Sequence, residues 1–540
     1  MKKSSFLEGA IIATIGVVLC KIIGLVYVIP FYAIIGKEGG TLYSYAYSIY
    51  AIFLSLSTSG IPIAISKIVS EYNALGYYKT KEKAFKIGSK LLILTGFLCF
   101  IVLMIFAEKI AYLIIGNTDG GTSISQVAFV IRIVSTALLI VPSLSVTKGY
   151  LQGHKIMKPS SVANVLEQLV RVIVILLGSY LTLKVFNLSI ETGVGISVFA
   201  ATVGAISAYF YLVFKIKRNK ENLNITDKES NEEKNISSKD VLKKIITYAI
   251  PFIVIDLINS AYGMIDVFSV VRTMTNLGYD KIDSEVALSV MATWGSKLNM
   301  IVIPIAVGIT TSLIPNIASS FAKKDLKDVN GKINQAFESL IFIALPMTLG
   351  LSFLAKEVWV VFYGYDLLSI NVFRLYVLLS LSYCLFTISV NITQTLNHTK
   401  LALGTLIGSF LVKAIINVPV MHLFKMIGLE VYYAPVAVTM FTQLGSTLFI
   451  RYMLKRKFNF EFKKSNINIF KILLCSLIMI GSLFIFKQFV DLGTHDRMIN
   501  LLSCVIYAVI GGLIYFILVY KTKLFEKIIG NNLLNKFKKK

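Results

Sequence analysis

The sequence has few charged residues for its length. Only 15% of its 540 residues are charged, 56% are hydrophobic, and the mean hydropathy is +0.75. A soluble protein of this size needs more charge on its water-facing surface. This composition excludes a soluble globular protein and indicates a polytopic membrane protein.

Cysteine and histidine are scarce, and neither residue type is clustered. No CxxC pair occurs, and all five cysteines lie in apolar runs: Cys20, Cys99, Cys384, Cys475 and Cys504. This arrangement predicts neither disulfides nor a metal site. The four histidines are scattered as well: His154, His398, His422 and His495. A P-loop, a nucleophile constellation and a metal motif are also missing, so we expect no enzyme activity and no cofactor.

Long apolar runs dominate what is present. The run after Met1 has no small-residue cleavage site, which favours a first membrane span over a signal peptide. Windows of about twenty apolar residues, the length of a membrane-crossing helix, predict an all-α fold. Fourteen spans are expected, near residues 9–35, 43–69, 88–107, 127–151, 160–183, 192–215, 243–271, 287–320, 333–354, 370–395, 402–424, 428–453, 468–489 and 498–520.

Basic residues give the chain a formal net charge of +25 and concentrate in alternate loops. The positive-inside rule explains this pattern without a nucleic-acid partner and predicts that both termini are cytoplasmic. The longest polar segment, residues 217–241, is expected to be a solvated cytoplasmic linker. It separates an N-terminal six-helix lobe, 1–216, from a C-terminal six-helix lobe, 242–454. Residues 455–540 add helices 13 and 14 and a basic tail.

The two six-helix lobes resemble each other in sequence. Landmarks recur at a slowly drifting offset of 242 to 253 residues, as in the pairs Pro62/Pro315, Ala84/Ala336, Lys158/Lys400 and Arg171/Lys413. Apolar helices align easily, but matched proline and lysine positions favour a true repeat. Six spans return the chain to its starting side, so the repeats are parallel, as in transporters that rock around a substrate.

The stretch "STSGIPIAISKIVSEY" carries glycine, proline and hydroxyl residues inside a predicted span. Proline loosens helical hydrogen bonding, and hydroxyls can satisfy the freed carbonyls. Gly60 and Pro62, with Pro315 in the second lobe, are therefore candidate hinge residues. Simple helix packing through small residues is an equally good interpretation of any one of these positions.

Two stretches resemble a known family: "KIIGLVYVIPFYAIIGKEGGTLYSYAYSIYAIFLSLSTSGIPIAISKIVSEYNALG" and "GHKIMKPSSVANVLEQLVRV". They are similar to the SpoVB/YtgP group of polysaccharide biosynthesis membrane proteins, in the MurJ-like branch of the multidrug/oligosaccharidyl-lipid/polysaccharide exporter superfamily. The resemblance implies a flippase for lipid II, the undecaprenyl-pyrophosphate-linked peptidoglycan precursor, working by alternating access in the bacterial cell membrane. It also implies a role in cell-wall synthesis and cell shape, or in sporulation.

The resemblance further implies partners and an energy source. The partners would be the lipid-linked cell-wall precursor and membrane lipids, with a monomer as the simplest assembly. Relatives draw on membrane potential or on a coupling cation, Na⁺ or H⁺. In relatives, helices 13 and 14 form a lateral groove for a polyprenyl tail, although here they could equally be a packing buttress.

Other functions remain open at this stage. A flippase for another lipid-linked glycan, of capsule, teichuronic or spore-cortex type, is the nearest alternative. A multidrug/cation antiporter usually has twelve spans and binds its cations with acids. A membrane glycosyltransferase or ligase would need a large outer loop with catalytic acids or histidines.

Charged residues inside spans are the candidate substrate contacts, because a charge in hydrocarbon needs a partner or a wet cavity. The resemblance implies that Lys21 and Lys297 bind the substrate diphosphate, although either could instead pair with a buried acid. The family's next basic position holds Tyr27 here. Arg171 is expected to pair with Glu167 at i, i+4 and could also reach the cavity.

Polar residues in the seventh predicted span share one helical face. Asp256, Asn259, Gly263 and Asp266 follow the spacing i, i+3, i+7, i+10. The two acids could balance the cations or bind a coupling cation, and we favour charge balance over a metal site. Tyr43, Tyr47 and Tyr50 form a stripe that is typical of an interfacial belt and less often of a sugar-stacking wall.

Overall fold

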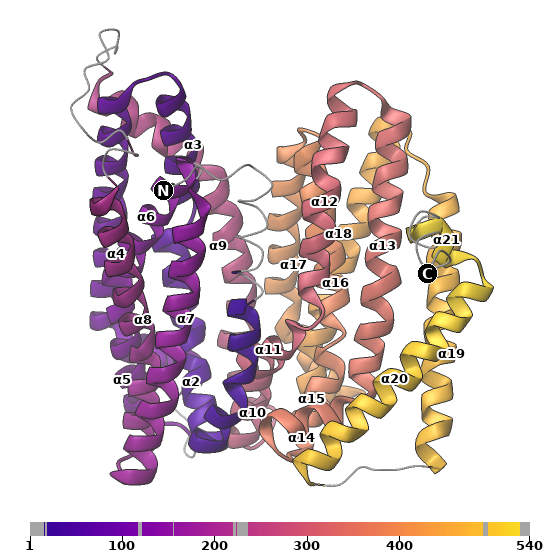
Figure 1. Cartoon of the computed structure of the whole chain (residues 1–540). Helices are drawn as coiled ribbons and strands as arrows, with labels where there is room; N and C mark the ends of the chain where they lie inside the picture. Colours follow the sequence, from indigo (N-terminus) through magenta and orange to yellow (C-terminus); the bar gives the residue numbers. More distant parts are fainter. Residues whose placement is uncertain are drawn as a thin grey trace. The chain divides into compact units, whose positions relative to one another are not determined.

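The described part of the chain is built from helices and contains no strand (Figure 1). The computed structural model describes residues 16, 19–116, 121–154, 156–219, 223, 236–489 and 495–529. These residues confirm the all-α prediction. The chain divides into unit 1, Met1–Arg272, and unit 2, Thr273–Lys540.

Unit 1 starts with helical residues 19–26. Its helices then follow in chain order: α2 (Val28–Thr58), α3 (Ile61–Ala74), α4 (Tyr78–Ile115), α5 (Ile124–Ser135), α6 (Val141–Gly153), α7 (Met157–Tyr180), α8 (Ile190–Arg218) and α9 (Ser238–Asn276), whose last turn lies in unit 2. Helix α2 is interrupted at Gly36, where φ is 65° and ψ is −168°. This interruption separates the first two predicted spans.

Unit 2 continues with shorter pieces before its long helices. These are α10 (Lys281–Ser289), a π-helical turn (Val290–Trp294), α11 (Gly295–Asn299), α12 (Ile303–Ala322), α13 (Leu326–Phe353), α14 (Ala355–Tyr363), α15 (Leu367–Tyr376), α16 (Leu379–Thr395), α17 (Thr399–Met426), α18 (Ala434–Phe458), α19 (Lys463–Phe489), α20 (Arg497–Lys521) and α21 (Leu524–Ile529). Helices α14 and α21 lie outside the predicted spans.

Each of the fourteen predicted spans coincides with helix in the described residues. Eleven helical stretches of that part are long and apolar enough to cross a membrane. Many large apolar side chains on these helices are exposed, among them Phe210, Ile415 and Phe441. Apolar side chains on the outside of long helices suit a hydrocarbon surround, and the chain is a multi-pass membrane protein.

Helices α2 and α3 are separated by a break at Ser59 and Gly60. Gly60 has a φ of 74°, a conformation that favours glycine. Pro62 lies in the first turn of α3, where its missing N–H costs no helical hydrogen bond. The hydroxyl of Thr58 donates to the carbonyl of Leu54 at 2.7 Å. The segment that contains the candidate hinge residues Gly60 and Pro62 therefore includes a break between two helices, α2 and α3.

Two neighbouring helices pack directly on this break. A Cβ added to Gly60 would lie 2.5 Å from the carbonyl oxygen of Ala249 on α9. A Cβ added to Gly149 on α6 would lie 2.5 Å from the carbonyl oxygen of Pro62. Near the C-terminal end of α3, Lys244 of α9 forms an ion pair with Glu71 at 2.7 Å. Small-residue packing and helix interruption thus occur together in this segment.

Unit 2 interrupts its corresponding helix at residues 300–302, before α12. Pro304 then lies in the first turn of α12, as Pro62 does in α3. Both prolines belong to the sequence IPIA, at 61–64 and 303–306, an offset of 242 residues. Pro315, which sequence comparison pairs with Pro62, lies inside α12. By position at the break, Pro304 is the counterpart of Pro62.

Helix neighbours also repeat between the units. In unit 1, α3, α4 and α6 pack against one another, and α7 packs against α8. In unit 2, α12, α13 and α16 do the same, and α17 packs against α18. The internal repeat seen in the sequence therefore extends to the packing of each unit.

The polar linker is anchored to unit 1 at Leu223. Its side chain is fully buried in a cluster of apolar residues from α3, α4, α6, α8 and α9. Its carbonyl oxygen accepts a hydrogen bond from Nζ of the buried Lys81 at 2.6 Å, and Lys83 donates to the carbonyl of Ile236 at 2.8 Å. The expectation of a solvated linker is wrong at Leu223, because the apolar cluster buries its side chain and Lys81, in the first turn of α4, binds its carbonyl.

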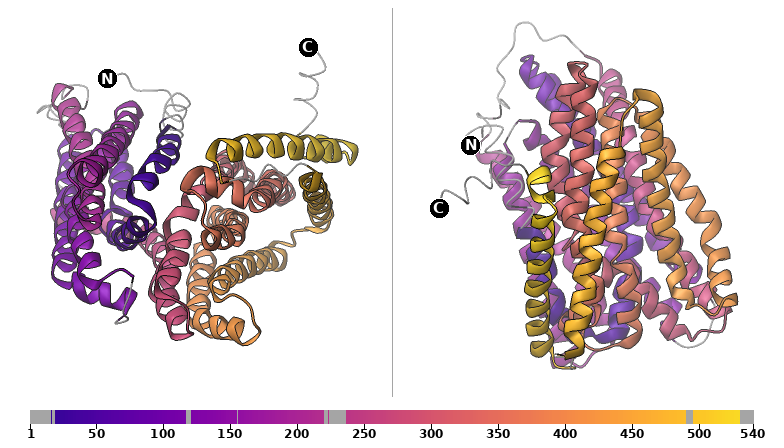
Figure 2. Two further views of the ribbon diagram at one scale, coloured as in Figure 1. Left: turned by 90° about the horizontal axis from the view of Figure 1, so that it is seen from below. Right: turned by 90° about the vertical axis from the view of Figure 1, so that its right-hand side faces the viewer.

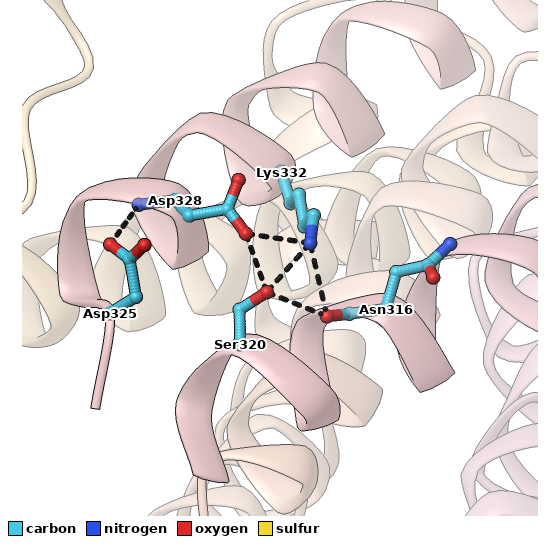
Figure 3. Close-up of polar contacts among 5 residues, drawn as sticks. All are labelled: Asn316, Ser320, Asp325, Asp328 and Lys332. Atoms are coloured by element: carbon cyan, nitrogen blue, oxygen red, sulfur yellow. Dashed lines mark hydrogen bonds and ion pairs between the residues drawn. The ribbon is translucent and has the colours of Figure 1, made fainter. Parts of the chain in front are cut away.

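Polar contacts join α12 to α13 (Figure 3). Lys332 forms an ion pair with Asp328 at 2.7 Å and donates to Oγ of Ser320 at 2.6 Å. The Ser320 hydroxyl donates to Asp328 in turn, and the Asp325 side chain accepts from the backbone N–H of Asp328 at 3.0 Å. Lys332 is thus part of a network that fixes the turn between two helices.

Helices α19 and α20 pack on α13 and α14 of unit 2. Helix α20 runs obliquely to α19 and lies along the edge of this unit (Figures 1 and 2). Lys487 of α19 forms an ion pair with Glu357 of α14, whose side chain is fully buried. Tyr515 of α20 donates to the carbonyl of Phe342 at 2.7 Å. These contacts make the two C-terminal spans an integral part of unit 2.

Replacing Gly60 by alanine should destabilise the protein by about 2–4 kcal/mol, because backbone strain adds to a clash with α9. The matched control is Gly76→Ala, since Gly76 has a φ of 76° and no neighbouring atom within 4 Å. Gly76→Ala should cost only the strain, about 1 kcal/mol. Thermal unfolding of both purified variants measures the difference, and equal midpoints would show that the contact with α9 contributes nothing.

Candidate functional site

The segment that carries Lys21 packs along α7. Cβ atoms added to Gly16 and Gly24 would lie 3.1 Å from the side chain of Ser161 and 3.3 Å from that of Gln168. Lys21 is partly exposed, and it forms no ion pair within the described part of the chain. The assignment of Lys21 to substrate binding stays a prediction.

Arg171 of α7 is surrounded by aromatic rings. Its guanidinium lies 5.4 Å from the centroid of the Tyr47 ring. Its other electrostatic neighbours are Tyr43, Tyr27 and Tyr50, and these four tyrosines are called the tyrosine cluster below. Cation–π attraction is worth about 0.5–2 kcal/mol and leaves the cation its full charge. Arg171 is therefore held in place without being neutralised.

The tyrosine cluster is an interior feature of unit 1. Tyr43 stacks on Tyr47 with ring centroids 5.7 Å apart, and Tyr43 and Tyr50 are only 1% and 3% exposed. Tyr27, which is 7% exposed, shares a side-chain hydrogen bond with Tyr43. The interfacial-belt interpretation of the stripe is wrong, because this face of α2 meets α7 instead of the membrane surface.

Glu167 pairs with a different cation from the one expected. Its Oε2 lies 2.9 Å from Nζ of Lys148 on α6. Arg171, one turn further along α7, is turned toward the tyrosine cluster. The predicted Glu167–Arg171 pair is therefore wrong in this structure. The i, i+4 spacing along α7 allowed this pair. Lys148, however, lies on another helix, and no local sequence pattern identifies it as the partner of Glu167.

Lys297 lies in unit 2, in the irregular part of its helix. It belongs to the five-residue helix α11, directly after the π-helical turn. Its Nζ lies 4.8 Å from the centroid of the Trp294 ring. Trp294 is fully buried, and its carbonyl accepts a hydrogen bond from Tyr363 at 2.9 Å. An aromatic anchor thus positions Lys297, as another positions Arg171.

The polar face of α9 is open along much of its length. Asn259 and Gly263 are exposed, and a Cβ added to Gly263 would meet nothing within 4 Å. Asp256 and Asp266 are partly exposed on the same face. No group of three or more His, Cys, Asp or Glu side chains in the described residues could hold a metal ion. The assignment of these acids to charge balance or to ion coupling stays a prediction.

The second-lobe counterpart of Arg171 has a different environment. Lys413 on α17 is 1% exposed, and Ser409 and Asn417, one turn away on either side, are buried with it. Beside this segment, a groove of about 250 Å³ is lined by residues of both α17 and α18. It is lined by Gly404, Gly408 and Gly445 together with hydroxyl and phenylalanine side chains. In unit 1, by contrast, α7 and α8 touch through their backbones at Gly204.

Comparisons with known proteins agree with this architecture. Residues 6–321 match the family described as "Polysaccharide biosynthesis protein". The chain is 32% identical to the lipid II flippase MurJ of Bacillus subtilis (strain 168), over 99% of both chains. It is 24% identical to the stage V sporulation protein B of the same organism, over 67% of this chain and 68% of the relative.

Solved structures show the same fold. A structure of the lipid II flippase MurJ in an inward closed conformation matches with a TM-score of 0.67 and 17% identity, covering 96% of this chain and all of the other. An inward-facing multidrug resistance MATE family transporter matches with a TM-score of 0.62 and 11% identity, over 82% of this chain and 98% of the other. The chain therefore belongs to the polysaccharide biosynthesis protein family, in the branch that contains the MurJ flippase of B. subtilis.

Proposed function

We propose that the protein is a flippase that moves lipid II from the inner to the outer leaflet of the bacterial cell membrane by alternating access. The observation that carries this proposal is the end-to-end similarity to the lipid II flippase MurJ, at 32% identity over 99% of both chains. The multi-pass helical fold and the cations held inside its spans support it. The protein needs no catalytic residues for this function.

The pyrophosphate of the substrate is bound by cations. Lys21 and Arg171 of unit 1 and Lys297 of unit 2 are the proposed contacts, with Tyr27 and the rest of the tyrosine cluster positioning Arg171. An isolated charge in the bilayer costs about 2.5–3.5 kcal/mol on insertion scales. An anionic head group offsets that cost, because charge-assisted hydrogen bonds to phosphate are the strongest available.

Charge balance and movement complete the proposal. Asp256, Asn259 and Asp266 on the open face of α9 balance the cations when no substrate is bound, or bind a coupling cation. The helix break at Gly60 and Pro62 is the hinge of unit 1. In unit 2 the hinge lies in the helix that contains Pro304 and Pro315. The protein works as a monomer with both termini in the cytoplasm.

Reconstitution tests the function directly. Vesicles that contain the purified protein should expose labelled lipid II to an enzyme added outside, whereas empty vesicles should not. The same assay with another undecaprenyl-linked glycan distinguishes the nearest alternative, a flippase for a different lipid-linked oligosaccharide. If only that glycan is exposed, it and not lipid II is the cargo. If neither lipid is exposed, the proposed flippase function is wrong.

Replacing Lys21 or Lys297 by alanine should lower lipid II exposure by about tenfold or more, because each loses a charge-assisted contact of about 1.5–3 kcal/mol. Lysine-to-arginine variants keep the charge and should retain most of the transport. Lys327→Ala, in the first turn of α13, is a control for general loss of positive charge. Full complementation of flippase-depleted cells by both alanine variants would reject these two contacts.

Tyr47 should be tolerant of phenylalanine and intolerant of leucine. Phenylalanine keeps the ring below the Arg171 guanidinium, whereas leucine removes about 0.5–2 kcal/mol of cation–π attraction. We therefore expect near-normal transport for Tyr47→Phe and a loss of about threefold to tenfold for Tyr47→Leu. Equal transport by the two variants would mean that ring stacking on Arg171 does not support substrate binding.

A further inference from the structure

An intramembrane ion pair lies next to the proposed cations of unit 1. Nζ of Lys148 on α6 and Oε2 of Glu167 on α7 are 2.9 Å apart. Their side chains are 18% and 26% exposed, so neither is sealed inside the packing. Sequence position alone marks Lys148 as a snorkelling lysine near a span end, and it carries no role in the function proposed above.

The surroundings of this pair connect it to Lys21 and Arg171. The thiol of Cys20, the residue before Lys21, lies within the electrostatic reach of both Lys148 and Glu167. Glu167 precedes Arg171 by one helical turn, and Tyr50 of the tyrosine cluster interacts with both of them. Arg171, Lys148 and Glu167 therefore gather where α2, α6 and α7 meet, next to the segment that carries Lys21.

We propose that Lys148 is a further contact for the pyrophosphate of the substrate. When substrate binds, Lys148 exchanges its counter-ion, the carboxylate of Glu167, for this pyrophosphate. This inference rests on the proposed function. Without substrate, the carboxylate offsets the cost of a lysine in apolar surroundings. A pyrophosphate offers more negative charge and more acceptor oxygens than one carboxylate, and so it displaces Glu167 from Lys148.

Competition from the Glu167 carboxylate helps transport, because it limits how tightly the substrate is held. A carrier must bind its cargo strongly enough to capture it and weakly enough to release it on the other side. Glu167 lowers the net affinity of the site, because each bound pyrophosphate must first break the ion pair. The return of Glu167 to Lys148 then favours release of the head group.

A purely structural role for the ion pair predicts a different effect of Glu167→Gln from the one that competition with substrate predicts. If the pair only joins α6 to α7, neutralising either partner leaves an uncompensated charge, and both single variants weaken the protein in the same way. If Glu167 competes with substrate, the two variants act in opposite directions. Glu167→Gln frees Lys148 for the substrate, and Lys148→Met removes the contact.

The experiment measures binding of undecaprenyl pyrophosphate and of lipid II to the full-length protein in nanodiscs. We expect Lys148→Met to weaken both affinities by about tenfold. We expect Glu167→Gln to tighten both by about threefold to tenfold and to slow lipid II exposure in vesicles. Glu167→Asp, which shortens the reach of the carboxylate, should lie between Glu167→Gln and the wild type and serves if Glu167→Gln folds poorly.

The ion pair between Arg132 and Glu108 provides a matched control. It also joins two helices of unit 1, at 3.0 Å, but its side chains are more exposed, at 39% and 67%. Arg132→Met and Glu108→Gln should leave both affinities unchanged. Weaker binding by Glu167→Gln, together with restored thermal stability in the Lys148→Met/Glu167→Gln double variant, would overturn the inference. A wild-type protein that binds neither lipid would overturn the proposed function itself.

Discussion

The need to stabilise positive charge inside a membrane governs this structure. The spans meet that need in two ways. Arg171 and Lys297 lie against aromatic rings, of Tyr47 and Trp294 respectively. Lys148 lies against the carboxylate of Glu167. An aromatic ring attracts a cation without cancelling its charge, whereas a carboxylate cancels it. For Arg171, aromatic support therefore leaves the charge available to an anionic ligand, whereas carboxylate support makes the availability of Lys148 conditional.

Close backbone packing decides where the helices can be interrupted. The break at Gly60 is covered by α9, and the following turn of α3 by α6, through contacts that only glycine allows. Polar groups at a break must find partners when no water is present, and neighbouring backbones and hydroxyls supply them. The break is thus held in a defined geometry by α6 and α9. Any movement of α3 must involve these two helices as well.

Local signals made the fold largely predictable from the sequence. The lengths of the apolar runs predicted the spans, and a glycine and a proline two residues apart, Gly60 and Pro62, marked the break between α2 and α3. What the sequence could not supply was the partner of each helix face. The stripe of Tyr43, Tyr47 and Tyr50 was visible as a periodicity, but its burial depends on α7. The Lys148–Glu167 pair likewise depends on two helices. The match of Pro62 to Pro304, by contrast, is present in the repeated sequence IPIA, and the position of the second break agrees with it.

The two lobes use equivalent positions differently, and this difference bears on which cations meet the substrate. Arg171 and Lys413 are repeat partners at an offset of 242 residues. Arg171 remains partly exposed on an aromatic support, whereas Lys413 is 1% exposed between buried polar residues of α17. A ligand can reach a partly exposed guanidinium but cannot reach a sealed ammonium without repacking the unit. This difference favours the proposal that Lys297, which is partly exposed on its irregular helix, and not Lys413 is the substrate contact of the second lobe.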